Sequence, residues 1–125
     1  MERKYILLYV DDEESNLDIF KNTFRREFTI YTANSAENGI EVLRQKEVDV
    51  VITDQRMPNK SGVEFLKEVN IMFPHIPPNR LIVSAFAKNE EIEEAFENYN
   101  LFSFIQKPWK EEELRRIILN AIEAN

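Results

Sequence analysis

Hydrophobic and polar positions along this chain alternate between two patterns. Short aliphatic and aromatic runs, typical of strands, are each followed by a stretch in which apolar residues return every three or four positions, as on one face of a helix. The runs expected to form strands are residues 5–10, 28–33, 50–52, 81–84 and 102–106. The alternation occurs five times and predicts a doubly wound α/β fold, in which a five-stranded parallel sheet carries helices on both faces.

Capping residues mark where several of the predicted helices begin. Ser35 and Asn89 precede helical stripes, and Ser61 with Glu64 three residues later forms a capping box. Gly39 lies inside the second helix, where glycine costs about 1 kcal/mol relative to alanine. The third helix is expected to end at a group of three prolines, Pro74, Pro77 and Pro78.

Composition narrows the class of protein. The 125 residues include 43% hydrophobic and 31% charged residues and no cysteine, which is typical of one compact domain without disulfide or thiolate chemistry. We expect residues 1–125 to form a single cytoplasmic domain, because no segment resembles a signal peptide or a membrane span. The net charge of −7 argues against direct nucleic-acid binding, which needs clustered lysine and arginine, and suits binding of cations or basic partners.

Three carboxylates, a hydroxyl and an amine are expected to meet at one edge of the predicted sheet. Asp11 and Asp12 follow the first strand, Asp54 follows the third, Ser84 ends the fourth and Lys107 follows the fifth. The carboxyl ends of parallel strands share an edge, and ligands bind there in open α/β sheets. Like charges about 4 Å apart repel by roughly 4 kcal/mol at an effective dielectric constant of about 20, so three carboxylates need a cation. The all-oxygen donors favour Mg²⁺, and the set suits phosphoryl transfer to a carboxylate.

Each of these residues also has an ordinary structural explanation when it is considered alone. Asp54 could cap its own turn, and the acidic residues 11–14 suit the positive end of a helix. Lys107 could be a solvated lysine, and Ser84 a plain hydroxyl at a strand end. The functional interpretation depends on their occurring together.

Four short motifs stand at the ends of the predicted strands. They are Asp-Asp-Glu at 11–13, Asp-Gln-Arg-Met-Pro at 54–58 with Gly62 four residues later, Leu-Ile-Val-Ser-Ala at 81–85 and Lys-Pro-Trp at 107–109. With these motifs in this order, the chain resembles a response-regulator receiver domain of two-component signalling over essentially its whole length. The resemblance implies a flavodoxin-like (βα)5 receiver fold, and a histidine kinase or histidine phosphotransfer protein as the phosphoryl donor.

The resemblance also implies roles for residues of the acidic edge. Asp54 matches the phosphoacceptor, and Asp11 and Asp12 match the acidic pair that binds Mg²⁺. Asp12 is expected to contact the ion directly, beside Asp54 and the backbone carbonyl of Arg56. Lys107 matches the lysine of the family, which is followed by a proline whose preceding peptide bond is typically cis.

A conformational switch is implied by two further positions. Ser84 matches the hydroxyl that turns toward the phosphoryl group, and Phe104 matches the aromatic residue that follows it inward. The family often has tyrosine at the second position, so Phe104 would act through packing alone; it could equally be a fixed core residue. The stretch 77–80 is slightly longer than the segment that usually leads into the fourth strand in this family.

The surface formed by the fourth helix, the fifth strand and the fifth helix carries a surplus of aromatic residues, as docking surfaces do. These residues are Phe86, Phe96, Tyr99, Phe102 and Trp109. The resemblance implies that this surface serves output, by regulated dimerisation or by binding a partner that the sequence does not identify. Trp109 could instead pack at the start of the last helix.

Three other functions are alternatives for a chain with these residues. A receiver-like scaffold that is never phosphorylated remains open, although an intact site argues against it. An Mg²⁺-dependent phosphatase with Asp54 as nucleophile would be expected to carry an acid two residues later, where this chain has Arg56. A flavin-binding protein would need a phosphate-binding loop after the first strand, where acidic residues stand instead.

Overall fold

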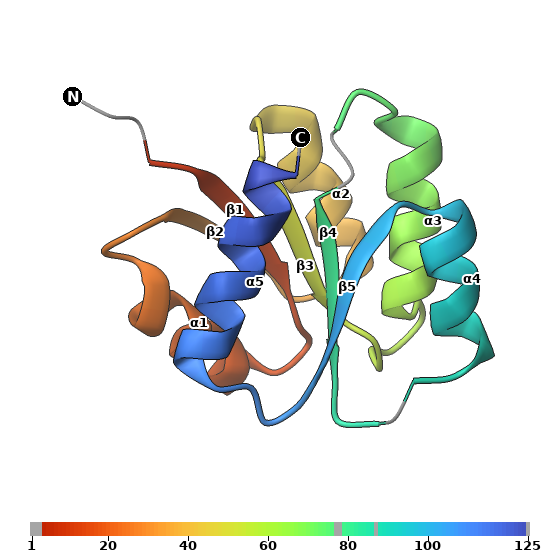
Figure 1. Ribbon diagram of the computed structural model, residues 1–125. Coiled ribbons are helices and arrows are strands. Elements are labelled where there is room, and N and C mark those ends of the chain that lie inside the picture. Colours follow the sequence, from red (N-terminus) through yellow and green to blue (C-terminus); the bar gives the residue numbers. More distant parts are fainter. Residues whose placement is uncertain (1–3, 77–78, 87, 125) are drawn as a thin grey trace.

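Five strands and five helices alternate along the part of the chain that the structure describes. The structure is a computed structural model that describes residues 4–76, 79–86 and 88–124 (Figure 1). The elements in chain order are β1 (Ile6–Val10), α1 (Glu14–Phe24), β2 (Thr29–Ala33), α2 (Ala36–Gln45), β3 (Val50–Asp54), α3 (Gly62–Met72), β4 (Arg80–Ser84), α4 (Glu90–Asn98), β5 (Leu101–Gln106) and α5 (Glu111–Glu123).

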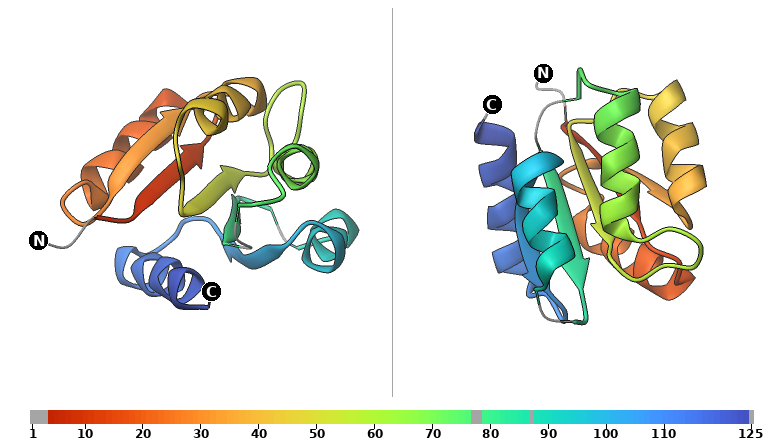
Figure 2. Two further views of the ribbon diagram at one scale, coloured as in Figure 1. Left: turned by 90° about the horizontal axis from the view of Figure 1, so that it is seen from above. Right: turned by 90° about the vertical axis from the view of Figure 1, so that its right-hand side faces the viewer.

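All strand pairs of the sheet are parallel, and the strand order is β2-β1-β3-β4-β5. One face of the sheet packs against α1 and α5, and the other packs against α2, α3 and α4 (Figures 1 and 2). The predicted doubly wound fold with a five-stranded parallel sheet is therefore confirmed. No helix within residues 4–76, 79–86 and 88–124 combines the length and apolar character that crossing a bilayer requires.

The central strand β3 is buried on both faces, as its apolar run predicts. Val51 contributes to the core under α2, α3 and α4, whereas Val50 and Ile52 contribute to the core under α1 and α5. The strand is two residues longer than the run 50–52 and includes Asp54. Consequently the first polar residues after the run are held in the sheet rather than in a flexible loop.

The predicted helix caps are present. Ser35 Oγ accepts a hydrogen bond from Asn38 N at 3.1 Å, and Asn89 Oδ1 accepts one from Ile92 N at 3.2 Å. Ser61 and Glu64 form the reciprocal capping box at the start of α3. Helix α3 ends at Met72, before Pro74. Pro77 and Pro78, which begin the stretch 77–80, lie outside the described residues.

Gly39 is explained by close packing between α2 and α3. A Cβ atom at this position would lie 2.9 Å from the ring of Phe65 and 3.2 Å from Val10 Cγ2. Phe65 and Val10 are fully buried, so neither side chain has room to move away. Glycine lowers the helix propensity at this position, but it allows α2 to pack closely against α3 and β1.

A buried arginine stands at the opposite end of the sheet from the acidic residues. Arg80 begins β4 and is fully buried, and its guanidinium donates to Asn70 Oδ1 at 2.9 Å, Tyr99 O at 3.1 Å and Ile76 O at 3.3 Å. Burial lowers the pKa of this group. Tyr99 lies just beyond the end of α4, so Arg80 ties that end of the helix to the sheet and to α3.

Candidate functional site

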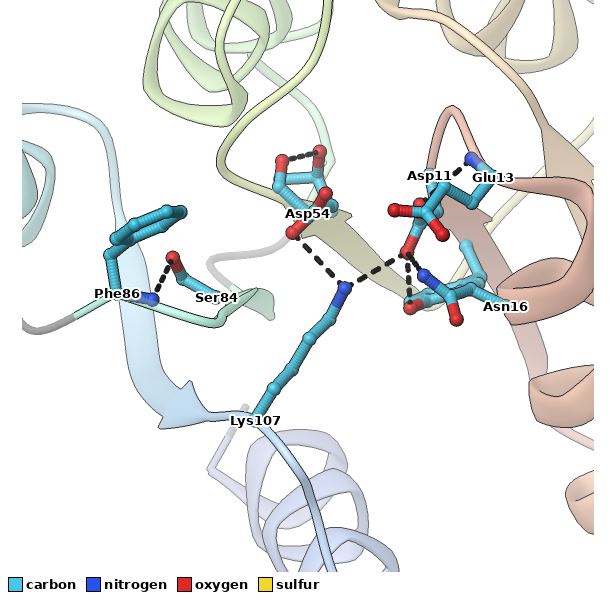
Figure 3. A network of polar contacts seen from close by, with 9 residues as sticks. Asp11, Glu13, Asn16, Asp54, Ser84, Phe86 and Lys107 are labelled. Atoms are coloured by element: carbon cyan, nitrogen blue, oxygen red, sulfur yellow. Dashed lines mark hydrogen bonds and ion pairs between the residues drawn. The ribbon is translucent and has the colours of Figure 1, made fainter.

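The carboxyl edge of the sheet brings together four of the predicted site residues. Asp11 and Asp12 follow β1, Asp54 ends β3 and Lys107 follows β5. One carboxylate oxygen from each of the three aspartates lies within 4.8 Å of the others. Figure 3 shows the Lys107 ammonium between Asp11 and Asp54. The topological argument from parallel strands therefore predicts this cluster correctly.

Asp11 is the most enclosed acid of the cluster. It is fully buried, and its Oδ2 atom accepts hydrogen bonds from Tyr9 Oη at 2.9 Å, Asn16 Nδ2 at 3.2 Å and Lys107 Nζ at 3.2 Å. Its other oxygen accepts from Glu13 N at 3.0 Å. Neither Tyr9 nor Asn16 stands out in the sequence as part of the site.

Lys107 is the shared cation of the two buried acids. Its ammonium lies 3.2 Å from Asp11 Oδ2 and 3.3 Å from Asp54 Oδ1. Burial of the amine favours the neutral form, but the two carboxylates outweigh this effect and raise the pKa of Lys107. The Lys107 backbone N–H donates to Ser84 O at 2.7 Å, and the peptide bond to Pro108 is cis, as predicted.

Asp54 sits where the end of β3 meets the start of α3. It is 8% exposed, and burial raises the pKa of its carboxyl group; Lys107 opposes the increase and Asp11 adds to it. A Cβ atom at Gly62 would lie only 2.5 Å from the Asp54 carbonyl oxygen. Glycine at this position therefore permits the backbone of α3 to approach Asp54.

The residues at this edge fit a hard divalent cation. Three carboxylates face one ammonium group, so the cluster carries excess negative charge, and burial, which disfavours the ionised form, raises the pKa of Asp54. The donors are oxygen atoms only, which suits Mg²⁺. Asp12 is exposed, and no hydrogen bond to its carboxylate is formed within the described part of the chain, so it is the freest of the three to bind an ion.

Ser84 and Phe104 lie beside an open hollow of about 460 Å³ next to the cluster. The hollow also touches the loop after β3 and the start of α4, through Gln55 and Ile92. Ser84 is buried, and its hydroxyl accepts a hydrogen bond from Phe86 N at 3.1 Å (Figure 3). Phe104 is half-buried and packs against the core beneath α2, α3 and α4. The two predicted switch residues therefore line one space.

The same hollow is bordered by two contacts between the β3–α3 loop and the region of α4. Gln55 accepts a hydrogen bond from Val63 N at 2.9 Å and donates one to Glu91 Oε2 at 3.1 Å. The guanidinium of Arg56 lies 3.9 Å from the ring centre of Phe86. The residues directly after Asp54 are thus connected to the N-terminal end of α4.

Trp109 packs inward rather than standing free. Its ring lies 5.7 Å from that of Phe24 and 6.2 Å from that of Phe20, between ring centres, and the side chain is half-buried. Of the two alternatives for Trp109, packing at the start of the last helix is confirmed. His75 is exposed, at the far end of the sheet, with its ring edge on Phe73.

The arrangement matches a known family. A sequence model of the response regulator receiver domain matches residues 7–119. The chain belongs to the response regulator receiver domain family. Receiver domains of response regulators are signalling switches that take part in two-component regulation, typically bind Mg²⁺ at an acidic pocket, and work with a histidine kinase partner and output domains.

The receiver domain is similar to parts of longer regulators. It is 34% identical to the hydrogenase transcriptional regulatory protein HoxA of Cupriavidus necator over 98% of this chain and 25% of HoxA. It is 30% identical to the transcriptional regulatory protein GlrR of Escherichia coli over 94% of this chain and 26% of GlrR. The chain thus spans about a quarter of the length of these curated relatives.

Solved structures of whole receiver domains have the same fold. The signal receiver domain of an HD domain-containing protein from Pseudomonas fluorescens matches with a TM-score of 0.90 at 24% identity, covering 98% of this chain and 97% of that one. A response regulator receiver domain protein from Clostridium thermocellum matches with a TM-score of 0.81 at 27% identity, covering 96% and 95%.

Proposed function

We propose that this receiver domain accepts a phosphoryl group on Asp54 from a phosphohistidine of a histidine kinase or a histidine phosphotransfer protein. The observation that carries the proposal is the position of Asp54, which shares Lys107 with Asp11 at the edge of the sheet where Asp12 also lies. A carboxylate beside a fixed ammonium group and further acids suits covalent phosphoryl chemistry.

In the proposed transfer, one carboxylate oxygen of Asp54 forms a bond to phosphorus while the phosphorus–nitrogen bond of the phosphohistidine breaks and its electron pair stays on the imidazole. Lys107, 3.3 Å from Asp54 Oδ1, neutralises charge on the phosphoryl oxygens. The fixed ammonium group acts by electrostatic stabilisation and costs no reorganisation during transfer. Later attack by water returns the Asp54 carboxylate and releases inorganic phosphate.

Asp12, Asp54 and the backbone carbonyl of Arg56 are proposed to hold Mg²⁺ directly, with Asp11 completing the acidic pair. Bound Mg²⁺ supplies charge neutralisation for the phosphoryl oxygens. Asp11 is buried and both of its carboxylate oxygens already accept hydrogen bonds, which favours an indirect role for this residue. Asp12 is exposed, which favours direct contact with the ion.

Ser84 and Phe104 are proposed to pass the change at Asp54 to the surface formed by α4, β5 and α5. Ser84 would exchange its hydrogen bond with Phe86 N for one to the phosphoryl group, and Phe104 would move into the hollow that both residues line. Exposed Phe86 and Phe102 make this surface suitable for dimerisation or for binding an output partner. We place this activity in the cytoplasm, with residues 1–125 acting as one receiver unit without direct contact to nucleic acid or membrane.

The alternative functions have less support. A phosphatase would need an acid near the position of Arg56, whose guanidinium instead lies over Phe86. A scaffold independent of phosphorylation would not require three clustered carboxylates, which repel one another when no cation is bound.

Intact-mass analysis after incubation with acetyl phosphate and Mg²⁺ tests the proposal. We expect the parent chain to gain the mass of one phosphoryl group and the Asp54→Ala variant to gain none. Asp18→Ala is a matched control, because Asp18 is an exposed aspartate on α1, and it should behave as the parent does. A parent chain that gains no mass, or an Asp54→Ala variant that gains as much as the parent, would refute the assignment.

A further inference from the structure

The aromatic ring of Tyr9 belongs to the core, but its hydroxyl belongs to the acidic edge. Tyr9 is 1% exposed, and its ring is stacked on Phe20 with ring centres 4.3 Å apart and planes 11° from parallel. Its hydroxyl donates to Asp11 Oδ2 at 2.9 Å. A phenylalanine would fill the same core space, so packing alone does not explain the hydroxyl.

Among the donors to Asp11 Oδ2, Tyr9 has the most rigid support. Asn16 comes from the first turns of α1 at a distance of 3.2 Å, and Lys107 reaches the same oxygen at 3.2 Å through a long side chain that is 20% exposed. Tyr9 lies in β1, two residues before Asp11, and its ring is held by Phe20. The Tyr9 hydroxyl is therefore held in place, and its hydrogen bond fixes the orientation of the Asp11 carboxylate.

The orientation of Asp11 affects Asp54 through Lys107. The ammonium group is 3.2 Å from Asp11 Oδ2 and 3.3 Å from Asp54 Oδ1, so it bridges the two acids. If the Asp11 carboxylate turned, Oδ2 would move, and Lys107 would follow it or lose one partner. Misplacement of a charged group by a fraction of an ångström reduces its effect on a reacting centre.

We propose that Tyr9 is a positioning residue of the receiver site: its hydroxyl fixes Asp11 in the orientation that places the Lys107 ammonium beside Asp54. The inference rests on the proposed function, because it names a further residue for phosphoryl transfer to Asp54. Tyr9 itself does not touch the phosphoryl group, and it acts through Asp11. Its second link, through Phe20 to Trp109, connects the same ring to the start of α5.

The test is a double-mutant cycle on Tyr9 and Asp11. The rate constant of phosphorylation is measured at saturating acetyl phosphate and Mg²⁺ for the parent, Tyr9→Phe, Asp11→Ala and the double variant. We expect Tyr9→Phe to slow the reaction by roughly 3- to 10-fold, which corresponds to the loss of one hydrogen bond. In the Asp11→Ala background the same change should have almost no effect, because the oxygen that accepts the Tyr9 hydrogen bond is already absent.

A second readout follows metal binding without phosphorylation. Trp109 is the single tryptophan of the chain, and its fluorescence serves to titrate Mg²⁺ alone. The Mg²⁺ dissociation constant of Tyr9→Phe should stay within about twofold of the parent value, because the proposed direct ligands Asp12 and Asp54 are intact. Thermal melting of each variant confirms that it is folded at the assay temperature.

Tyr99→Phe is the matched control. The Tyr99 hydroxyl also donates to a carboxylate, that of Glu94 at 2.6 Å, but this contact lies on the exposed C-terminal half of α4, so its loss should leave the rate unchanged. Equal slowing by Tyr9→Phe in both backgrounds, no slowing in either, or Mg²⁺ binding that weakens in step with the rate would overturn the assignment. A parent chain that is not phosphorylated would instead refute the proposed function itself.

Discussion

Replacing Lys107 with methionine is expected to lower the free energy of unfolding of the metal-free domain by roughly 3 kcal/mol, because removing one partner of a buried ion pair leaves the other charge uncompensated. Within the described residues, no other lysine or arginine forms an ion pair with Asp11 or Asp54. Asp11 is fully buried and Asp54 is nearly so. Methionine retains most of the side-chain volume, so the decrease in the free energy of unfolding measures the effect of the charge rather than of packing.

Urea denaturation in the presence of a chelator measures the effect of Lys107→Met. Lys88→Met is a suitable control, because Lys88 pairs with Glu93 at 3.2 Å but both side chains are at least half exposed, and exposed pairs contribute little. Mg²⁺ should restore part of the stability of Lys107→Met, since the ion supplies the missing positive charge. If Lys107→Met unfolds at the same urea concentration as Lys88→Met, Lys107 does not neutralise the buried acids.

Asp54→Asn is expected to stabilise the metal-free domain at pH 7 by roughly 1–2 kcal/mol, because it removes one of three crowded charges. Burial raises the pKa of Asp54 above its ordinary value of 3.8 in the folded state. The folded chain then holds more protons than the unfolded chain between these two pKa values, so stability falls as the pH rises through that interval. Asparagine does not ionise, so the stability of the Asp54→Asn variant does not decrease for this reason.

The stability difference between Asp54→Asn and the parent should therefore depend on pH. In chelator, the two chains should be about equally stable near the ordinary carboxyl pKa of 3.8. The difference in their free energies of unfolding should increase as the pH rises and then stay constant. Adding Mg²⁺ should reduce this difference, because the ion stabilises the parent more than it stabilises the variant. Asp18→Asn, on the exposed side of α1, should show no comparable gain. An Asp54→Asn variant that is less stable than the parent in chelator at pH 7 would argue against crowded carboxylates.

The cluster of acids and lysine could be predicted from sequence because it depends on topology more than on side-chain detail. Once five parallel strands are inferred from the hydrophobic pattern, the residues after β1, β3 and β5 must share an edge. Asp12, Asp54 and Lys107 lie far apart in the chain, yet their meeting requires only the strand order and the strand ends.

Contacts that depend on how side chains pack could not be predicted in the same way. Tyr9 appears in the sequence as one more aromatic residue of a strand, and only its stacking on Phe20 and its distance to Asp11 show the second role. Gln55 and Glu91 are 36 positions apart, and neither belongs to a hydrophobic pattern. The sequence pattern predicts Arg80 in a connecting stretch, but its guanidinium is enclosed by α3 and the end of α4.

The two ends of α4 are held differently, which bears on the proposed switch. Its C-terminal end is tied to buried Arg80 through Tyr99 O, whereas its N-terminal end borders the hollow lined by Ser84 and Phe104 and is linked to Gln55 through Glu91. We therefore expect a change beside Asp54 to reach the N-terminal end of the helix first.

The structure of the receiver domain bound to Mg²⁺ and beryllofluoride, which mimics a phosphoryl group on an aspartate, tests the account most directly. We predict beryllofluoride on Asp54, the ion in contact with Asp12 and Asp54, Lys107 beside the fluorides, and the Ser84 hydroxyl released from Phe86 N. Beryllofluoride bound at another side chain, or an ion that leaves both Asp12 and Asp54 free, would contradict the claim that this edge of the sheet receives the phosphoryl group.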